Sequence, residues 1–196
     1  MKIAVRPTSI PEVLIVEHEV FEDDRGFFME VYRADLFRDF ADLGLPDRFV
    51  QLNHSRSIRG VTRGLHFQWD PPSGKLMRVT RGEAFLVAVD IRPGSPTLGR
   101  YATLVANEKN RLQLWTPATF ARGFCILSEI ADVEYLTTGI YNPLAESGIR
   151  WDDPAIGIAW PLADPILSTK DASAQTLAEW LARPEAEHFR LEPQAR

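Results

Sequence analysis

The chain has 196 residues, of which 45% are hydrophobic and 25% are charged, and 22 Lys and Arg against 27 Asp and Glu give a formal net charge of −5. These proportions are those of a globular protein and exclude a collagen-like, disordered or disulfide-stapled chain. The mild acidity argues against general nucleic-acid binding. At about 150 residues per domain, the length predicts a single domain over residues 1–196.

The cysteine content and the hydrophobicity pattern indicate the cellular compartment. Cys125 is the one cysteine, which excludes an intrachain disulfide and fits a reducing cytoplasm. Residues 1–10 lack the apolar stretch of a signal peptide. No run approaches the roughly 18 apolar residues of a membrane span. We therefore expect a cytoplasmic protein that does not bind membranes.

The N-terminal quarter predicts a hairpin and one short helix. Residues 13–20 are rich in β-branched side chains, and the turn-like residues 23–26 would lead back into a strand over residues 27–32. Apolar residues at helical spacing predict a helix over residues 34–43, which Gly44 ends.

The rest of the chain predicts closely spaced strands. The candidates are residues 49–54, 64–68, 75–81, 83–91, 101–106, 111–116, 123–127 and 133–138, separated by loops rich in Pro, Gly, Asn and Ser. Such spacing without intervening helices predicts an all-β fold, an antiparallel sandwich or barrel. The Pro- and Trp-containing residues 141–170 predict an ordered strap over it. A final helix is expected over residues 173–181, with Leu177, Trp180 and Leu181 facing inward.

His66 is the most informative of the four histidines, which are His18, His54, His66 and His188. Strict alternation in a strand puts His66 on the face opposite Arg63. One interpretation is a buried histidine that a carboxylate or carbonyl satisfies, and another is a group that projects into a barrel cavity. A metal ligand is the third, but Gly64 and Gln68 occupy the positions where a second imidazole of a His-x-His pair would stand, so we predict no metal site.

Other candidate side chains have both a functional and a purely structural interpretation. Arg25, Arg59, Arg63, Lys75 and Arg78 form a basic set that suits either a diphosphate or a solvated surface. Tyr135 and Tyr141 suit either a core or a proton donor with a stacking surface. Cys125 lies in an apolar run and is expected to be a small core residue.

Nine stretches in one order then resemble the dTDP-4-dehydrorhamnose 3,5-epimerase family, a cupin-fold group that acts on nucleotide-linked 4-keto-6-deoxy sugars. They are FEDDRGFFME (21–30), FVQLNHS (49–55), RGLHFQ (63–68), GKLMRV (74–79), VDIRPGSPTLG (89–99), NRLQLWTP (110–117), YNP (141–143), GIRWDDPAIGIAWP (148–161) and LSTKD (167–171). The resemblance implies a cupin jelly-roll barrel with a few short peripheral helices and a C-terminal helix and tail over residues 172–196. It also implies a homodimer in which N-terminal strands pair with the partner's sheet.

The resemblance further implies a reaction without metal or organic cofactor, in which C3, C5 or both are deprotonated next to the C4 ketone and reprotonated from the opposite face. His66 would be the base and Asp171 would orient it, while Lys75 would stabilise the enolate oxygen and Tyr135 would supply a proton from the other face. The ligand would be a nucleotide-diphosphate sugar, most simply dTDP-linked. Contacts to it are expected from Arg25, Glu30, Gln51, Asn53, Arg63, Arg122, Tyr141 and Lys170.

Two positions depart from the family pattern. Leu86 stands where the family reads Asp, and Arg122 stands where it reads His. The retained base, lysine and tyrosine predict that epimerase chemistry survives. Three alternatives stay open: an epimerase that inverts a single carbon of a variant nucleotide sugar, a non-catalytic cupin that binds sugar nucleotides, and a metal-dependent cupin such as a dioxygenase.

Overall fold

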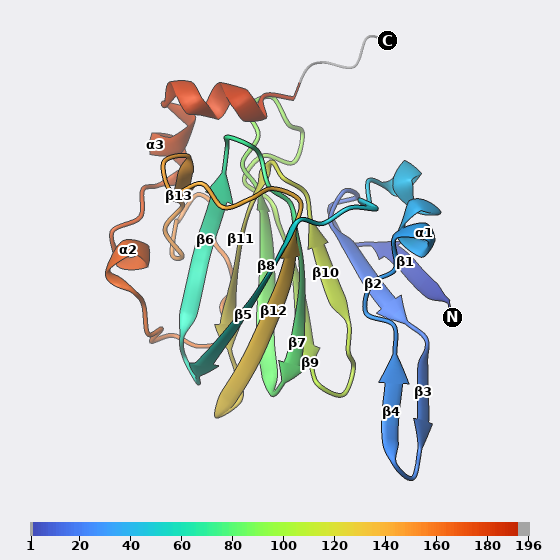
Figure 1. The fold of residues 1–196 in the computed structure, drawn as a ribbon. Helices are drawn as coiled ribbons and strands as arrows, with labels where there is room; N and C mark the ends of the chain where they lie inside the picture. The colour runs from blue at the N-terminus through green and yellow to red at the C-terminus, as the bar shows by residue number, and fades with distance from the viewer. Residues whose placement is uncertain (1, 192–196) are drawn as a thin grey trace.

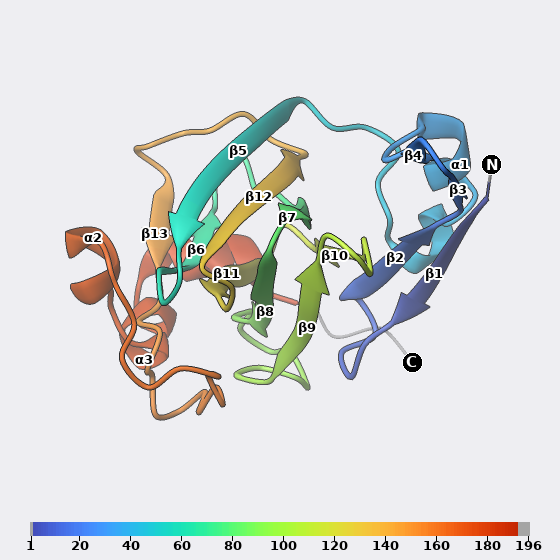
Figure 2. The same cartoon turned by 90° about the horizontal axis from the view of Figure 1, so that it is seen from below.

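Two antiparallel sheets face each other and make up most of the molecule, and the computed structural model describes residues 2–191 (Figures 1 and 2). The six-stranded sheet has the order β1 (Ile3–Pro7), β2 (Leu14–His18), β10 (Gln113–Thr116), β7 (Lys75–Arg81), β12 (Ile130–Thr137) and β5 (Gln51–Ile58). The five-stranded sheet has the order β13 (Glu146–Gly148), β6 (Thr62–Gln68), β11 (Phe120–Ile126), β8 (Glu83–Asp90) and β9 (Tyr101–Asn107). The predicted all-β jelly-roll fold is confirmed.

The pleat of the strands divides apolar side chains between two cores. In β8, Leu86 and Ala88 pack in the interior between the sheets, whereas Phe85 and Val87 pack on the outer face of the five-stranded sheet. Trp180 from the C-terminal segment covers that outer face. Because both faces of β8 are buried, its sequence is a continuous apolar run rather than an alternating one.

A separate hairpin projects from the N-terminal side of the barrel (Figure 1). Its strands β3 (Val20–Asp23) and β4 (Gly26–Met29) pair only with each other. The predicted hairpin is therefore confirmed, but the predicted strand over residues 13–20 divides into β2 and β3. The division follows Glu19, whose N–H donates to the Lys2 carbonyl where the β1–β2 pairing ends.

The helices are shorter than predicted. Residues 34–43 divide into α1 (Ala34–Arg38) and the 3₁₀ helix η1 (Ala41–Leu43), which ends as expected at Gly44 with φ of 86°. Residues 168–189 form α2 (Thr169–Ala172), α3 (Leu177–Leu181) and the 3₁₀ helix η2 (Pro184–Phe189) in place of one helix over residues 173–181. Ser168 and Thr176 each cap a new helix by accepting a backbone N–H, which explains the division.

The strand boundaries and buried residues agree with most of the remaining predictions. The ends of strands β5 to β12 lie within four residues of the predicted positions, and β7 agrees at both ends. Leu177 and Trp180 are buried as expected, and so is Cys125. The sequence did not predict β1, β13, α2 or η2. Within residues 2–191, no helix is long and apolar enough to cross a membrane.

Candidate functional site

A cavity of about 230 Å³ lies between the two sheets. It is lined by Asn53, Arg63, His66, Lys75, Met77, Arg122, Gly123, Phe124, Tyr135, Tyr141 and Glu146. A narrower recess adjoins it and adds Gln51, Gln68 and Thr137 to the shared lining. Both sheets and the strap that follows β12 therefore contribute side chains to one site.

His66 and Asp171 form a pair at this cavity. His66 comes from β6, and its Nε2 lies 2.5 Å from Oδ1 of Asp171 in α2. The hydroxyl of the helix cap Ser168 donates to the other carboxylate oxygen at 2.7 Å. Burial by itself raises the pKa of Asp171, but hydrogen bonds from His66 and Ser168 outweigh burial and hold that pKa below its ordinary value. Asp171 is thus a carboxylate that fixes the imidazole and can stabilise its protonated form.

A bulge in β6 corrects the predicted orientation of Arg63. The pairing of β6 with β11 changes register, so that Arg122 lies opposite His66 but Phe124 lies opposite Arg63. Three residues of β6 thus span two of β11, which places Arg63 at the cavity beside His66 rather than on the other face. The close approach of β6 and β11 requires a glycine at position 64, because a Cβ there would lie 2.7 Å from the Cα of Gly123.

Tyr135 and Lys75 come from the six-stranded sheet, across the cavity from His66. Lys75 Nζ lies 4.9 Å from the centroid of the Tyr135 ring. Burial lowers the pKa of Lys75 to about 7, and the charge of Arg122 adds to the effect. Burial also raises the pKa of Tyr135, so this phenol keeps its proton at neutral pH. The arrangement supplies an imidazole from one wall and a proton-bearing hydroxyl from the other.

Polar contacts join the strap to the mouth of the cavity. The Tyr141 N–H donates to Gln51 Oε1 at 3.1 Å, and Gln51 in turn donates to Asn53 at 2.9 Å. Glu146 accepts from the Tyr141 hydroxyl at 2.9 Å and from Lys170 Nζ at 2.5 Å. Four residues of this region were predicted from the sequence as substrate contacts: Gln51, Asn53, Tyr141 and Lys170. Glu146 was not predicted. The sequence feature that could have indicated Glu146 is its position in the short gap between the matching stretches at residues 141–143 and 148–161.

Arg122 occupies the cavity wall and has no anionic partner among the residues that the structure describes. It is only 3% exposed, and its Nη2 donates to the Pro117 carbonyl at 3.2 Å. Its Nε and Nη1 are buried and lack hydrogen-bond partners within the described part of the chain. Burial lowers the pKa of this guanidinium to about 9. Leu86, the other departure from the family pattern, is fully buried in the interior core.

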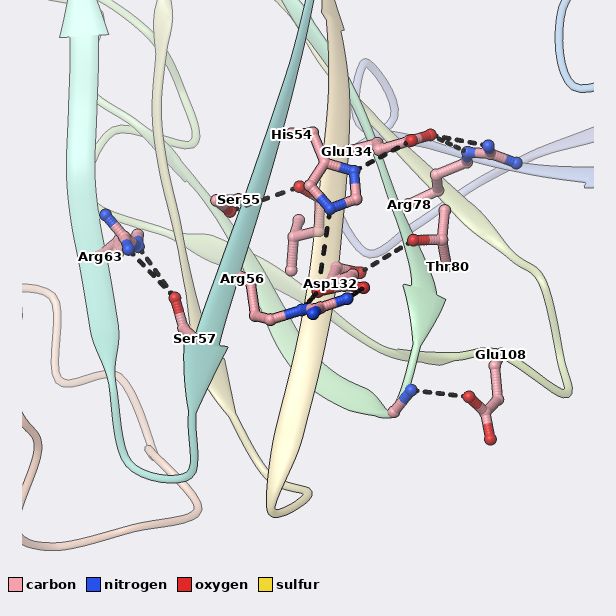
Figure 3. A network of polar contacts seen from close by, with 12 residues as sticks. His54, Ser55, Arg56, Ser57, Arg63, Arg78, Thr80, Glu108, Asp132 and Glu134 are labelled. Atoms are coloured by element: carbon pink, nitrogen blue, oxygen red, sulfur yellow. Dashed lines mark hydrogen bonds and ion pairs between the residues drawn. The ribbon is translucent and has the colours of Figure 1, made fainter.

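The outer face of the six-stranded sheet holds residues that the site does not use. His54 Nδ1 on β5 lies 3.2 Å from Oε1 of Glu134, and Arg78 Nη2 donates to Oε2 of the same carboxylate at 2.7 Å; Figure 3 shows this group of side chains. His54 therefore lies on a strand, in agreement with the predicted strand over residues 49–54, and it faces away from the cavity. Arg78 likewise points outward, so it does not belong to the basic set at the cavity, and Arg59 lies in the turn after β5.

Two predicted contacts lie on or beside the projecting hairpin. Arg25 is exposed in the turn between β3 and β4, where it pairs with Asp23, and Glu30 pairs with Arg33. Neither lines the cavity of its own chain. Among residues 2–191, no group of three His, Cys, Asp or Glu side chains is arranged to hold a metal ion.

Comparison with known proteins points to one family. The family model of dTDP-4-dehydrorhamnose 3,5-epimerase matches residues 7–179. The protein of that name from Pseudomonas aeruginosa is 49% identical over 172 residues, which are 87% of this chain and 94% of that protein. A relative of the same name from Neisseria gonorrhoeae is 49% identical over 174 residues, and the match covers 88% of this chain but 52% of that longer protein.

A solved structure gives the same result. The dTDP-6-deoxy-D-glucose-3,5-epimerase of Legionella pneumophila, crystallised in complex with dTDP-4-keto-L-rhamnose, has a TM-score of 0.89 and 44% sequence identity to this chain. The match covers 97% of this chain and 100% of that one.

Proposed function

The chain belongs to the dTDP-4-dehydrorhamnose 3,5-epimerase family and is an epimerase, and we propose that it inverts C3, C5 or both in a dTDP-4-keto-6-deoxyhexose. The observation that carries the proposal is the pair of proton-transfer groups on opposite walls of one cavity. The His66–Asp171 pair stands on one wall and Tyr135 on the other. Inversion requires removal of a proton from one face of a carbon and delivery to the other face.

The first step is deprotonation by His66. A carboxylate only accepts hydrogen bonds, so Nε2 of His66 carries the hydrogen directed at Asp171, and Nδ1 is the nitrogen free to take a proton. This nitrogen removes the hydrogen from the carbon beside the C4 ketone. The electron pair of the broken C–H bond forms a C=C bond to C4, and the π pair of the carbonyl moves onto the C4 oxygen, which gives an enolate. Asp171 stabilises the resulting imidazolium.

The second step is reprotonation by Tyr135. Its hydroxyl gives a proton to the carbon from the opposite face, and the enolate collapses to the ketone. Lys75 lies beside Tyr135 and carries the charge that stabilises the enolate oxygen between the two steps. Arg63, Gln51, Asn53, Tyr141 and Lys170 hold the nucleotide, diphosphate or sugar at and around the cavity.

A homodimer remains part of the proposal. The hairpin exposes Phe21, Phe27 and Phe28 by 50–60% and carries Arg25 at its turn. A second copy of the chain would cover these phenylalanines, and Arg25 and Glu30 would contact substrate only through such an assembly. Sedimentation equilibrium is the check, and a monomer at assay concentration would contradict the dimer. The cytoplasm likewise stays a prediction.

The direct test of the function is hydrogen exchange. The protein is incubated with dTDP-4-keto-6-deoxyglucose in deuterated water, and label at C3 and C5 is followed by NMR. Label at both carbons identifies a double epimerase. Label at one carbon identifies a single-carbon epimerase, one of the alternatives that Leu86 and Arg122 raise. Binding without label, beside an active homologue, would identify a non-catalytic cupin and refute the proposal.

The His66→Ala variant tests the assignment of the base. We expect it to abolish exchange at both carbons, because no other histidine of the described chain lines the cavity. Full activity of this variant would refute the assignment.

A further inference from the structure

Arg122 differs from Arg92, the other buried arginine among residues 2–191. Arg92, which is similarly buried, donates to Asp90 at 2.6 Å and to Glu12 at 3.0 Å. Arg122 has no carboxylate partner within residues 2–191, and two of its three nitrogens lack any hydrogen-bond partner there. A buried charge without a counter-charge is costly, so a fold normally pairs it, as this one does for Arg92.

The surroundings keep Arg122 unpaired. It stands on β11 opposite His66 on one neighbouring strand and Ala88 on the other. Leu86, one step along the same interior face of β8, offers no acceptor. Glu146 lines the same cavity, but its Oε2 accepts from Tyr141 and Lys170, and within residues 2–191 it forms no ion pair with Arg122.

The cavity therefore holds two basic side chains, Lys75 and Arg122, and no carboxylate within residues 2–191 is paired with either. Lys75 lines it beside Arg122, and its ammonium has no carboxylate partner among the described residues. A 4-keto sugar is neutral at its ring, so the bound substrate brings no counter-charge to Arg122 at that ring. Only a negative charge that develops during the reaction, or one that the ligand carries elsewhere, can compensate it.

We propose that Arg122 is a catalytic residue of the epimerisation proposed above, on which this inference rests, and that its guanidinium stabilises the C4 enolate oxygen together with Lys75. A fixed cation in a low-dielectric site interacts weakly with the neutral ketone and strongly with the enolate. It therefore lowers the energy of the transition state more than that of the bound substrate, which is the condition for faster chemistry. A contact with the diphosphate would instead strengthen ground-state binding, because that charge is present throughout.

The Arg122→Met variant separates these roles. It keeps the length of the side chain and removes the charge. We expect the rate of deuterium exchange at saturating substrate to fall about 10²-fold, with the affinity for dTDP unchanged within twofold. The midpoint of thermal unfolding without ligand should be unchanged or higher, because an unpaired buried charge has been removed. The Arg122→Lys variant, which retains a cation, should lose less activity.

Arg63 provides the matched control, since it lines the same cavity but is exposed. We expect Arg63→Met to weaken dTDP binding more than it slows exchange at saturation, the opposite pattern. The alkaline limb of exchange should also move to higher pH in Arg122→Met, because Lys75 keeps its proton longer without the neighbouring guanidinium.

Three results would overturn the inference. They are exchange within threefold of the parent rate in Arg122→Met, a loss confined to dTDP affinity, and a lowered unfolding midpoint that accounts for the lost activity. If the parent protein binds the substrate but exchanges neither hydrogen, the proposed function fails as well. If the parent exchanges normally and the variant equals it, only the role of Arg122 fails.

Discussion

Replacing Asp171 with asparagine tests the acid–base pair with little change in shape. Asn keeps the volume of the side chain and the acceptor for Ser168, but it removes the charge that faces His66 at 2.5 Å. The imidazolium formed on deprotonation of the sugar then lacks its counter-charge. A hydrogen bond to a charged group contributes about 1.5–3 kcal/mol, and about 1.4 kcal/mol corresponds to tenfold in rate. We therefore expect exchange to slow about 10- to 150-fold.

The same variant makes a prediction about acid stability. The pKa of Asp171 in the folded protein lies below its ordinary value, so its contribution to stability is fully present above about pH 4. That contribution is lost as the pH falls through the folded-state pKa. The parent protein should therefore be more stable than Asp171→Asn in urea at neutral pH, and the difference should shrink toward strongly acidic pH.

A surface carboxylate serves as the control for this variant. Asp152 bonds to Arg150 at 2.6 Å, but both side chains are exposed and neither lines the cavity. Asp152→Asn should leave exchange unchanged and alter stability by less than about 1 kcal/mol. Deuterium exchange at C3 and C5 is measured for both variants at equal substrate saturation. Exchange in Asp171→Asn at the parent rate would refute the role given to the carboxylate.

Three further predictions concern other parts of the mechanism and the fold. Tyr135→Phe should slow formation of the inverted product about 10²-fold or more while hydrogen loss to solvent persists, and equal inhibition of both would contradict its role as the proton donor. The kcat/KM of exchange should fall as the pH rises through about 7, because Lys75 loses its proton there. The Lys75→Arg variant should move this alkaline limb to higher pH. If the limb does not move, a group other than Lys75 causes it. Asp90→Ala should lower the free energy of unfolding by about 3–5 kcal/mol, because Arg92 would lose its buried partner, and urea titration measures this change.

Local sequence patterns determined the elements of this protein. Closely spaced β-type runs without intervening helices predicted the all-β fold, and β7 begins and ends where the pattern placed it. Apolar residues at helical spacing placed Leu177 and Trp180 against the core. These features depend on residues near in sequence, where side-chain period and turn chemistry suffice. The order of nine motifs also indicated His66, Lys75 and Asp171 as one set, and the resemblance to the family added Tyr135.

Tertiary structure decided the features that depend on register and on contacts distant in sequence. Strand alternation placed Arg63 on the wrong face, because a bulge depends on the close approach of two strands at Gly64 and Gly123. Asp171 meets His66 across 105 residues of sequence. Glu146 reaches the cavity only because the strap adds β13 to the edge of β6. Whether Arg122 has a counter-charge depends on every strand packed around it, so only the folded chain reveals an unpaired cation beside the base.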